Sequence, residues 1–217
     1  MISERVRSGN DALLVAPVRG LSSEVAPMLR ALEGYDPEAV GVGLSAEEMR
    51  GLNEYFVLSA AEPVVPLTST ETSEVRGLSR FGEVRVPNPS FVGLLSWARA
   101  HSMPVEPLDP GEDRTADLFA EHIGYVELVR RTVKERGLSR RPPTPATADE
   151  FALAWDREAA GGRGSRAFAR SRDRYLVRGA RRLGTGRSRV AIVVDRERFD
   201  TVRSLLAGTT PDAMADD

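Results

Sequence analysis

The segment ALLVAPVRGLSSEVAPMLRALEGYDPEAVGVGLSAEEMR (residues 12–50) carries the pattern that decides the fold. Residues 12–16 and 39–44 are short apolar runs between turn-forming residues, which is typical of buried strands. After each run a serine, Ser22 or Ser45, is followed by acidic residues, which is the signature of a helix start. A strand–helix–strand–helix order predicts a parallel sheet with right-handed crossover connections.

The remaining apolar patterns continue this alternation. They predict a helix over 89–101, a strand over 103–108, helices over 114–137, from Thr147 and over 165–183, and a strand over 190–194 that leads into a helix ending near Leu206. The Thr- and Val-rich stretch over 63–89 leaves two interpretations open, a strand excursion or a partly helical loop.

These elements predict an α/β fold. We expect a mainly parallel central sheet of at least four strands, flanked by helices, with a helical insertion over about 110–183 before the last strand. Residues 1–208 would form one domain, and residues 209–217 a flexible acidic tail.

Composition removes several chemistries. The 217 residues include two histidines and no cysteine, which excludes disulfides, thiolate metal sites, cysteine nucleophiles and any three-histidine metal site within one chain. No stretch approaches about 18 consecutive apolar residues, so we predict no membrane span. The first eleven residues lack the apolar core of a secretory signal, and we therefore expect a cytoplasmic protein.

Charge is spread unevenly along the chain. Residues 1–125 hold 10 basic and 19 acidic residues, whereas residues 126–217 hold 20 and 13. Ten arginines crowd into residues 159–189, where Asp173 is the only acid. Such a cluster indicates either an anion-binding surface or a solvated helix face whose arginines pair with acidic neighbours. We do not expect nucleic-acid binding, because the whole chain is slightly acidic and has no basic motif with interleaved aromatic residues.

Three segments carry a resemblance to a known family. They are Leu13-Leu-Val-Ala-Pro-Val-Arg19 with Ser22-Ser-Glu-Val25, Asp36-Pro-Glu-Ala-Val-Gly-Val-Gly-Leu44 with Met49-Arg50, and Ala169-Arg-Ser-Arg-Asp-Arg-Tyr175 with the strand at 189–194. In this order they resemble the first strand and its turn, the second strand, and the arginine-rich helix and last strand of the TraB/Tiki-like superfamily. That group is also called the pheromone-shutdown or GumN group, and is related to the erythromycin-esterase and ChaN-type proteins. The resemblance covers most of the chain and implies metal-dependent peptide or ester hydrolysis by histidines and acidic residues at strand ends.

The sequence departs from the family at those functional positions. Arg19 stands where the family places a histidine, and Gly43 where it places a glutamate. The last strand runs into Asp195-Arg-Glu-Arg198, where a glycine–histidine turn is expected. A guanidinium cannot coordinate a metal, and glycine offers no ligand. The resemblance therefore implies a divergent member with degenerate catalytic motifs and no resident metal, which retains the Arg172-Asp173-Arg174-Tyr175 stretch.

Two sets of residues are candidates for a remaining site. Arg19, Arg172 and Arg174 could clamp an anion if the arginine-rich helix packs at the carboxyl edge of the sheet. Alternatively, Asp109, Asp195 and Glu197 follow strands and could bind a divalent metal such as magnesium, as a hydrolase with a relocated carboxylate site would require.

The sequence also leaves partners open. His101 and His122 fall on helices rather than at strand ends, and we expect both to be structural. The long helix predicted over 114–137 could pair with a second copy, so a homo-oligomer is one possibility. The ligand, the substrate and any other partner cannot be read from the sequence.

Overall fold

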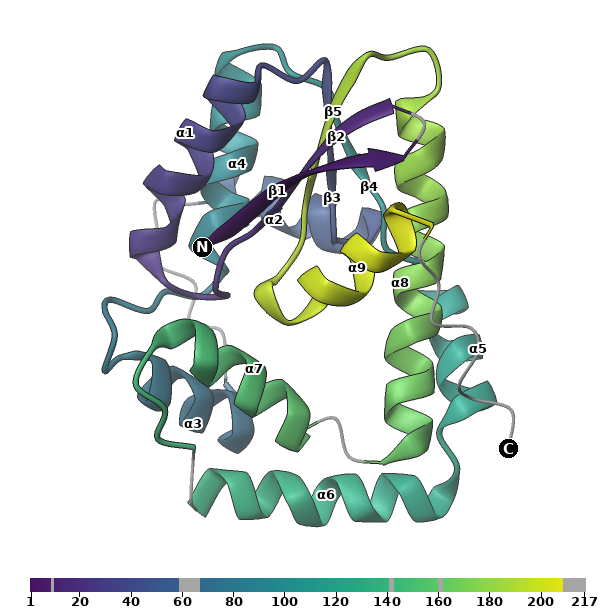
Figure 1. The fold of residues 1–217 in the computed structure, drawn as a ribbon. Coiled ribbons are helices and arrows are strands. Elements are labelled where there is room, and N and C mark those ends of the chain that lie inside the picture. Colours follow the sequence, from purple (N-terminus) through teal and green to yellow (C-terminus); the bar gives the residue numbers. More distant parts are fainter. Residues whose placement is uncertain (9, 59–66, 141–142, 160–161, 209–217) are drawn as a thin grey trace.

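The computed structural model describes residues 1–8, 10–58, 67–140, 143–159 and 162–208, and it confirms the predicted α/β class. Within these residues one sheet has five strands in the order β1-β2-β5-β3-β4 (Figure 1). They are β1 (Ile2–Ser8), β2 (Asn10–Ala16), β3 (Ala39–Val42), β4 (Val105–Pro107) and β5 (Arg189–Val193). Strands β2, β5, β3 and β4 run parallel, as the crossover pattern predicts.

Strand β1 is an addition to the predicted sheet. It pairs antiparallel with β2 in a hairpin, with Val6 opposite Ala12. Its residues Ser3, Glu4 and Arg5 are exposed, Ile2 is partly buried and Val6 is buried, so this strand at the sheet edge is mostly in water. The charged N-terminal residues therefore gave no apolar run that would predict a strand.

Helices cover both faces of the sheet (Figure 1). They are α1 (Val25–Tyr35), α2 (Ala46–Leu58), α3 (Ser69–Leu78), α4 (Pro89–Ala100), α5 (Glu112–His122), α6 (Tyr125–Arg140), α7 (Ala148–Ala159), α8 (Arg163–Gly184) and α9 (Phe199–Leu206), with short 3-10 turns η1 (Ser22–Glu24) and η2 (Arg196–Arg198). Alternate strand residues face opposite layers. Leu14 and Ile192 pack with α8 and α9, whereas Val15 and Val193 pack with α1 and α4.

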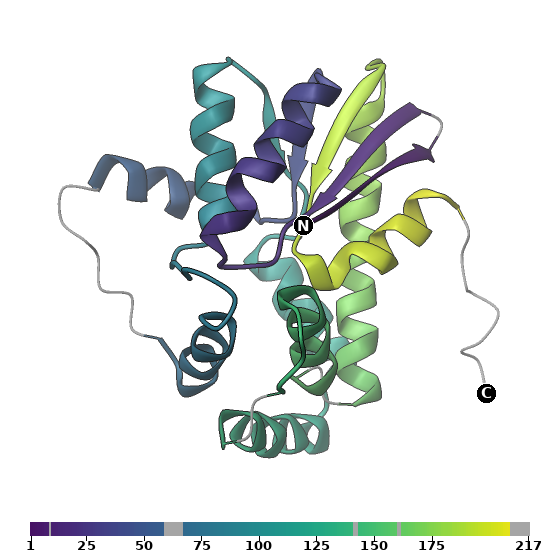
Figure 2. The ribbon, with the colours of Figure 1, turned by 60° about the vertical axis from the view of Figure 1, so that its left-hand side comes forward.

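A third apolar cluster lies beyond the carboxyl ends of the parallel strands. Leu78 of α3, Leu138 of α6, and Phe151 and Trp155 of α7 pack there beneath Val18, which follows β2. Figure 2 shows these helices as a separate group at that end of the molecule. Helix α3 begins with a capping box, in which Thr68 and Glu71 exchange side-chain and backbone hydrogen bonds. Of the two interpretations of residues 63–89, the partly helical one therefore holds for residues 67–89; residues 63–66 lie outside the described residues.

The single helix predicted over 114–137 is wrong. The chain forms α5 and α6 with a break at Ile123 and Gly124, because Ile123 leaves the helical conformation and buries its side chain. Helix α5 packs against α8, where His122 Nε2 lies 2.8 Å from the Ser171 hydroxyl. Helix α6 turns away toward α3 and α7. It leaves several apolar side chains in solvent: Tyr125, Val126, Leu128, Val129 and Val133.

The C-terminal part of the insertion predicted over 110–183 packs against the sheet before the last strand begins. The second half of α8 buries Leu176, Val177 and Leu183 against the sheet, so this helix belongs to the sheet layer as well as to the helical group. None of the helices described is long and apolar enough to cross a membrane. The predicted tail over 209–217 lies outside the described residues.

Two glycine substitutions test the contact between α3 and α7. A Cβ at Gly77 would overlap the ring of the fully buried Phe151, whereas a Cβ at Gly51 on α2 meets nothing within 4 Å. We expect Gly77→Ala to lower the free energy of unfolding by about 1–3 kcal/mol through overpacking. The matched Gly51→Ala should raise it by about 0.5–1 kcal/mol, because alanine favours a helix. Urea unfolding measures both, and a stabilised Gly77→Ala would contradict the close packing of α3 on α7.

Candidate functional site

A cavity of about 680 Å³ opens at the carboxyl edge of the parallel strands. Arg19 after β2, Gly43 after β3 and Asp195 after β5 line its floor, and α2, α3 and α4 supply its walls. Open parallel sheets bind ligands at this edge, because the loops after neighbouring strands diverge there and leave a crevice. The fold therefore places the cavity where a functional site is expected.

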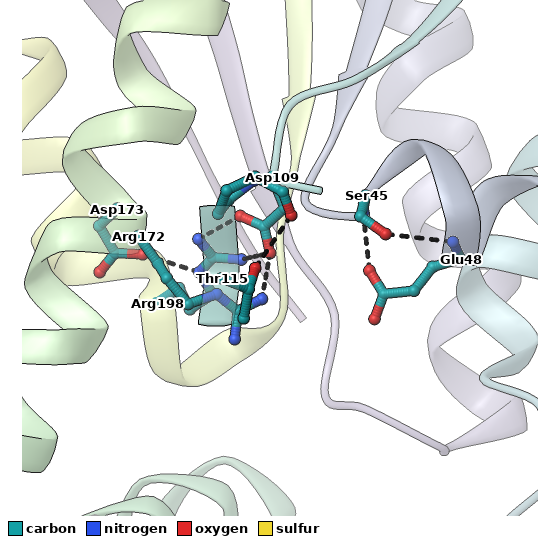
Figure 3. Close-up of polar contacts among 8 residues, drawn as sticks. Ser45, Glu48, Asp109, Thr115, Arg172, Asp173 and Arg198 are labelled. Carbon is teal, nitrogen blue, oxygen red and sulfur yellow. Dashed lines mark hydrogen bonds and ion pairs between the residues drawn. The ribbon is translucent and has the colours of Figure 1, made fainter. Parts of the chain in front are cut away.

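Beside the cavity lies a buried network of four charged side chains (Figure 3). Asp109, which follows β4, accepts hydrogen bonds from Nη1 and Nη2 of Arg198 at 2.8 and 2.7 Å, and a further one from Arg172. Arg198 donates from Nε to Asp173 at 2.7 Å. The Asp109 side chain is only 1% exposed, that of Asp173 is 7% and that of Arg198 is 16% exposed. The Arg172 side chain, at 33%, is the most exposed of the four. Two carboxylates and two guanidiniums thus neutralise one another, with both carboxylates buried.

The local structure explains how these residues meet. Arg198 is fixed by η2, the turn that directly follows β5, where its backbone amide donates to the Asp195 carbonyl. The backbone amide of Asp109 donates to the Leu44 carbonyl at 3.0 Å, which joins the ends of β4 and β3. Asp173 faces the core from α8, and Arg172 reaches Asp109 from the preceding position.

The network shifts the acidity of its members. Burial alone would raise the pKa of Asp109, but the guanidiniums of Arg198 and Arg172 hold it below its ordinary value. Burial dominates at Asp173 and raises its pKa, although Arg198 opposes that effect. The two carboxylates in turn raise the pKa of Arg198, so its charge is permanent.

Arg19 sits in a different environment, on the cavity side of the edge. Its side chain is accessible within the cavity and makes no hydrogen bond or ion pair with any residue that the structure describes. Acidic side chains surround it at longer range: Asp195, Glu74, Glu197 and Glu71. Burial would lower the pKa of Arg19, but these carboxyl groups raise it overall.

Three of the four carboxyl groups around Arg19 hold their protons unusually well, whereas hydrogen bonds from Thr68 lower the pKa of the fourth, Glu71. Burial is the main cause of the raised pKa of Glu74, Asp195 and Glu197, and their mutual repulsion adds to it. The pKa of Glu197 rises to about 8, so this side chain is largely protonated at neutral pH. Asp195 accepts a hydrogen bond from the Asn88 amide at 3.1 Å. Carboxyl groups therefore outnumber cations on this side of the cavity, and Glu197 holds a proton there in place of negative charge.

The structure separates the three arginines predicted to bind an anion. Arg19 and Arg172 line the same cavity, whereas Arg174 projects from the exposed face of α8 and does not line it. Arg172 directs its guanidinium to Asp109, and Arg19 is surrounded by carboxyl groups. The structure therefore favours anion binding by these three arginines less than the sequence pattern does.

The three carboxylates predicted to bind a metal do not act together either. Asp195 and Glu197 line the cavity, but Asp109 is occupied by two arginines. Within the described part of the chain, no three or more histidine, aspartate or glutamate side chains are grouped so that they could hold a metal ion. Asp109, Asp195 and Glu197 therefore do not form such a group.

Arg198 also fills the space beside Gly43, the position where the family resemblance implies a glutamate. A Cβ built on Gly43 would lie 3.3 Å from Nη1 of Arg198. The two departures from the family pattern, Gly43 and Arg198, are therefore neighbours in the structure. The Arg198 guanidinium occupies the space that a longer side chain at position 43 would need.

The sequence missed the contribution of α3 and its flanking turn. Glu71 and Glu74 lie on α3 and Asn88 precedes α4, all in or beside the stretch whose structure was left open. The capping-box pattern Thr68-Ser-Thr-Glu71 was the available signal for a helix there. Both histidines lie outside the cavity lining, as expected for structural residues; His101 Nδ1 is 2.8 Å from the Trp97 carbonyl.

Comparison with known proteins adds no assignment. No protein-family model matches this chain, and no curated protein matches it either.

Removing one member of the buried network tests its contribution to stability. Asp109→Asn should lower the free energy of unfolding at pH 7 by about 3–5 kcal/mol, because it leaves Arg198 buried with too little negative charge. Glu83→Gln removes an exposed ion pair with Arg85 and should cost less than about 1 kcal/mol. Urea unfolding compares them, and equal losses would contradict the role of the network.

The raised pKa of Glu197 predicts a pH dependence of stability. Between its ordinary value of 4.5 and the folded value of about 8, the folded protein holds a proton that the unfolded chain has released. Stability should therefore fall as pH rises through this window, and Glu197→Gln should flatten the fall. Unfolding curves from pH 5 to pH 8.5 measure the slope, with exposed Glu33→Gln as control. Parallel slopes in wild type and Glu197→Gln would show that Glu197 titrates normally.

Proposed function

We propose that this chain is a divergent, cytoplasmic TraB-like domain that has exchanged metal-dependent hydrolysis for the binding of a small organic ligand at the carboxyl edge of its sheet. The observation that carries the proposal is the position of Arg198. Its guanidinium directs Nε, Nη1 and Nη2 at Asp109 and Asp173 and fills the space beside Gly43.

This arrangement opposes metal binding on physical grounds. A divalent cation needs several oxygen or imidazole ligands that converge on one point. Arg198 offers none, places a permanent positive charge among the acids, and uses both oxygens of Asp109. The position that the resemblance assigns to a catalytic histidine is thus held by a side chain that stabilises the fold.

The neighbouring cavity supports a binding role. Its volume of about 680 Å³ lies within the range of about 300–1,000 Å³ that is usual for small-molecule sites. Apolar side chains from the surrounding helices form much of its wall, among them Leu52, Val75, Leu78 and Phe91. Charged and polar side chains complete the lining, and a mixture of apolar wall and polar groups is usual for a specific ligand site.

Two measurements on the intact chain test this function. With zinc, manganese, cobalt or magnesium, we expect no metal-dependent hydrolysis of peptide or p-nitrophenyl ester substrates above the metal-only background. Saturable turnover that EDTA abolishes would overturn the non-catalytic assignment.

Binding is tested with 1-hexanol as a neutral apolar probe, followed by the amide NMR signals of Gly43, Leu52 and Val75. We expect saturable shifts at these positions and their loss in Val75→Trp, which should fill the cavity. Val133→Trp, at an exposed position of α6, is the matched control and should bind the probe like the wild type. Near-UV circular dichroism verifies that both variants are folded.

A further inference from the structure

We infer that the ligand of this cavity carries a protonated amine joined to an apolar body. The inference rests on the proposed binding function and adds the chemical class of the ligand. It follows from the balance of charges that line the cavity, from the side chains left without partners there, and from the apolar wall opposite them.

Acids outnumber usable bases around the cavity. The lining includes six acidic residues: Glu48, Glu54, Glu71, Glu74, Asp195 and Glu197. It also includes four arginines: Arg19, Arg85, Arg172 and Arg198. Arg172 and Arg198 are neutralised by Asp109 and Asp173, and Arg85 pairs with Glu83 at 2.9 Å. Of these arginines only Arg19 lacks an ion pair within the described residues, so the cavity has a shortage of positive charge.

Among the described residues, Glu54 is an exposed acid on α2, and Glu74 and Glu197 are the two partly buried acids whose carboxyl groups are available to a ligand. Within the described residues, neither Glu74 nor Glu197 makes a hydrogen bond or ion pair with another residue. By contrast, Glu71 caps α3, and Glu48 accepts from the Ser45 amide at 2.7 Å (Figure 3). Glu74 and Glu197 are therefore the acceptors that a ligand ammonium would meet.

The surroundings of Glu197 explain why a cation would be favoured. Asp195 on the same turn, Asp156 on α7 and Glu74 on α3 face this region. Arg19 after β2 is the nearby cation that has no ion pair with any described residue, whereas Arg198 is committed to the buried network. Burial raises the pKa of Glu74, Asp156 and Glu197, and neighbouring acids raise the pKa of Glu74 and Glu197 further. A bound ammonium supplies the missing positive charge in place of a proton.

The other two kinds of charged ligand fit less well. An anion could bind Arg19, but it would add to the excess of negative charge. A metal ion would need three converging ligands, and the described residues offer no such group. An organic ammonium needs only one or two acceptors, and its apolar part can lie along Leu52, Val75 and Phe91.

The test uses three probes with the same six-carbon chain and different head groups: hexylamine, hexanoate and 1-hexanol. Calorimetric titration of the wild-type protein at pH 7.5 should show hexylamine binding about tenfold more tightly than 1-hexanol, and hexanoate binding more weakly than either. Hexylamine stays protonated here, since alkyl ammonium groups have pKa values of about 10. It should therefore release protons from the protein, which paired titrations in HEPES and phosphate detect, and its affinity should rise from pH 6 to pH 8.

Glu74→Gln and Glu197→Gln should each remove most of the preference for hexylamine while leaving 1-hexanol binding unchanged. Glu33→Gln, exposed on α1 away from the cavity, is the matched control and should keep the preference. If either cavity variant does not fold, the proton count and pH dependence of the wild type still decide the question.

The outcomes separate this inference from the proposed function. Equal binding of hexylamine and 1-hexanol would overturn the amine preference and leave a neutral ligand site in place. Tightest binding of hexanoate, with proton uptake, would overturn it in favour of an anion. If none of the three probes binds, the cavity is not a ligand site, and the binding part of the proposed function fails together with the inference.

Discussion

The rest of the site depends on the buried guanidinium of Arg198. It joins the turn after β5 to the end of β4 through Asp109, and to α8 through Asp173. A charge in this position is tolerated only if acids accompany it out of water, so the three elements must meet at one point. Arg172 adds a second donor to Asp109 and completes the neutralisation.

This network occupies one part of the carboxyl edge of the sheet, where Asp109 after β4 pairs with Arg198 after β5. The cavity opens beside it, along the ends of β2, β5 and β3. Arg19, Glu74 and Glu197 line the cavity without a direct bond to another residue that the structure describes. The paired charges hold the strand ends and α8 together, whereas the cavity side keeps charged groups without direct partners among the described residues.

The sequence predicted most of the framework, because strand patterns are local. Residues 12–16, 39–44 and 190–194 are apolar throughout, and their order is enough to place them in a parallel sheet. The half-exposed strand β1 lacks that signal. The break after His122 depends on the burial of Ile123 against other elements, so helical spacing alone does not show it.

The site itself was less predictable. Arg198 and Asp109 are separated by 89 positions, and nothing in either neighbourhood indicates that they pair. Arg172 was a candidate for anion binding if its helix packed at the edge, and it does line the cavity, but its guanidinium pairs with Asp109, which follows another strand. Glu74 lies on a helix within the stretch whose structure the pattern left open, so the acidic side of the cavity could not be foreseen. Charge pairing over long separations is a property of the folded chain.

The claim that a guanidinium stands where a metal would bind is tested most directly by adding Mn²⁺ to the isotopically labelled wild-type protein. Manganese broadens the NMR signals of nearby nuclei, so a bound ion reports its own position. The account predicts that the amide signals of Gly43, Leu44 and Asp109 keep their intensities at substoichiometric Mn²⁺. Selective loss of these three signals would show that a metal binds at the strand ends despite Arg198, and would contradict it.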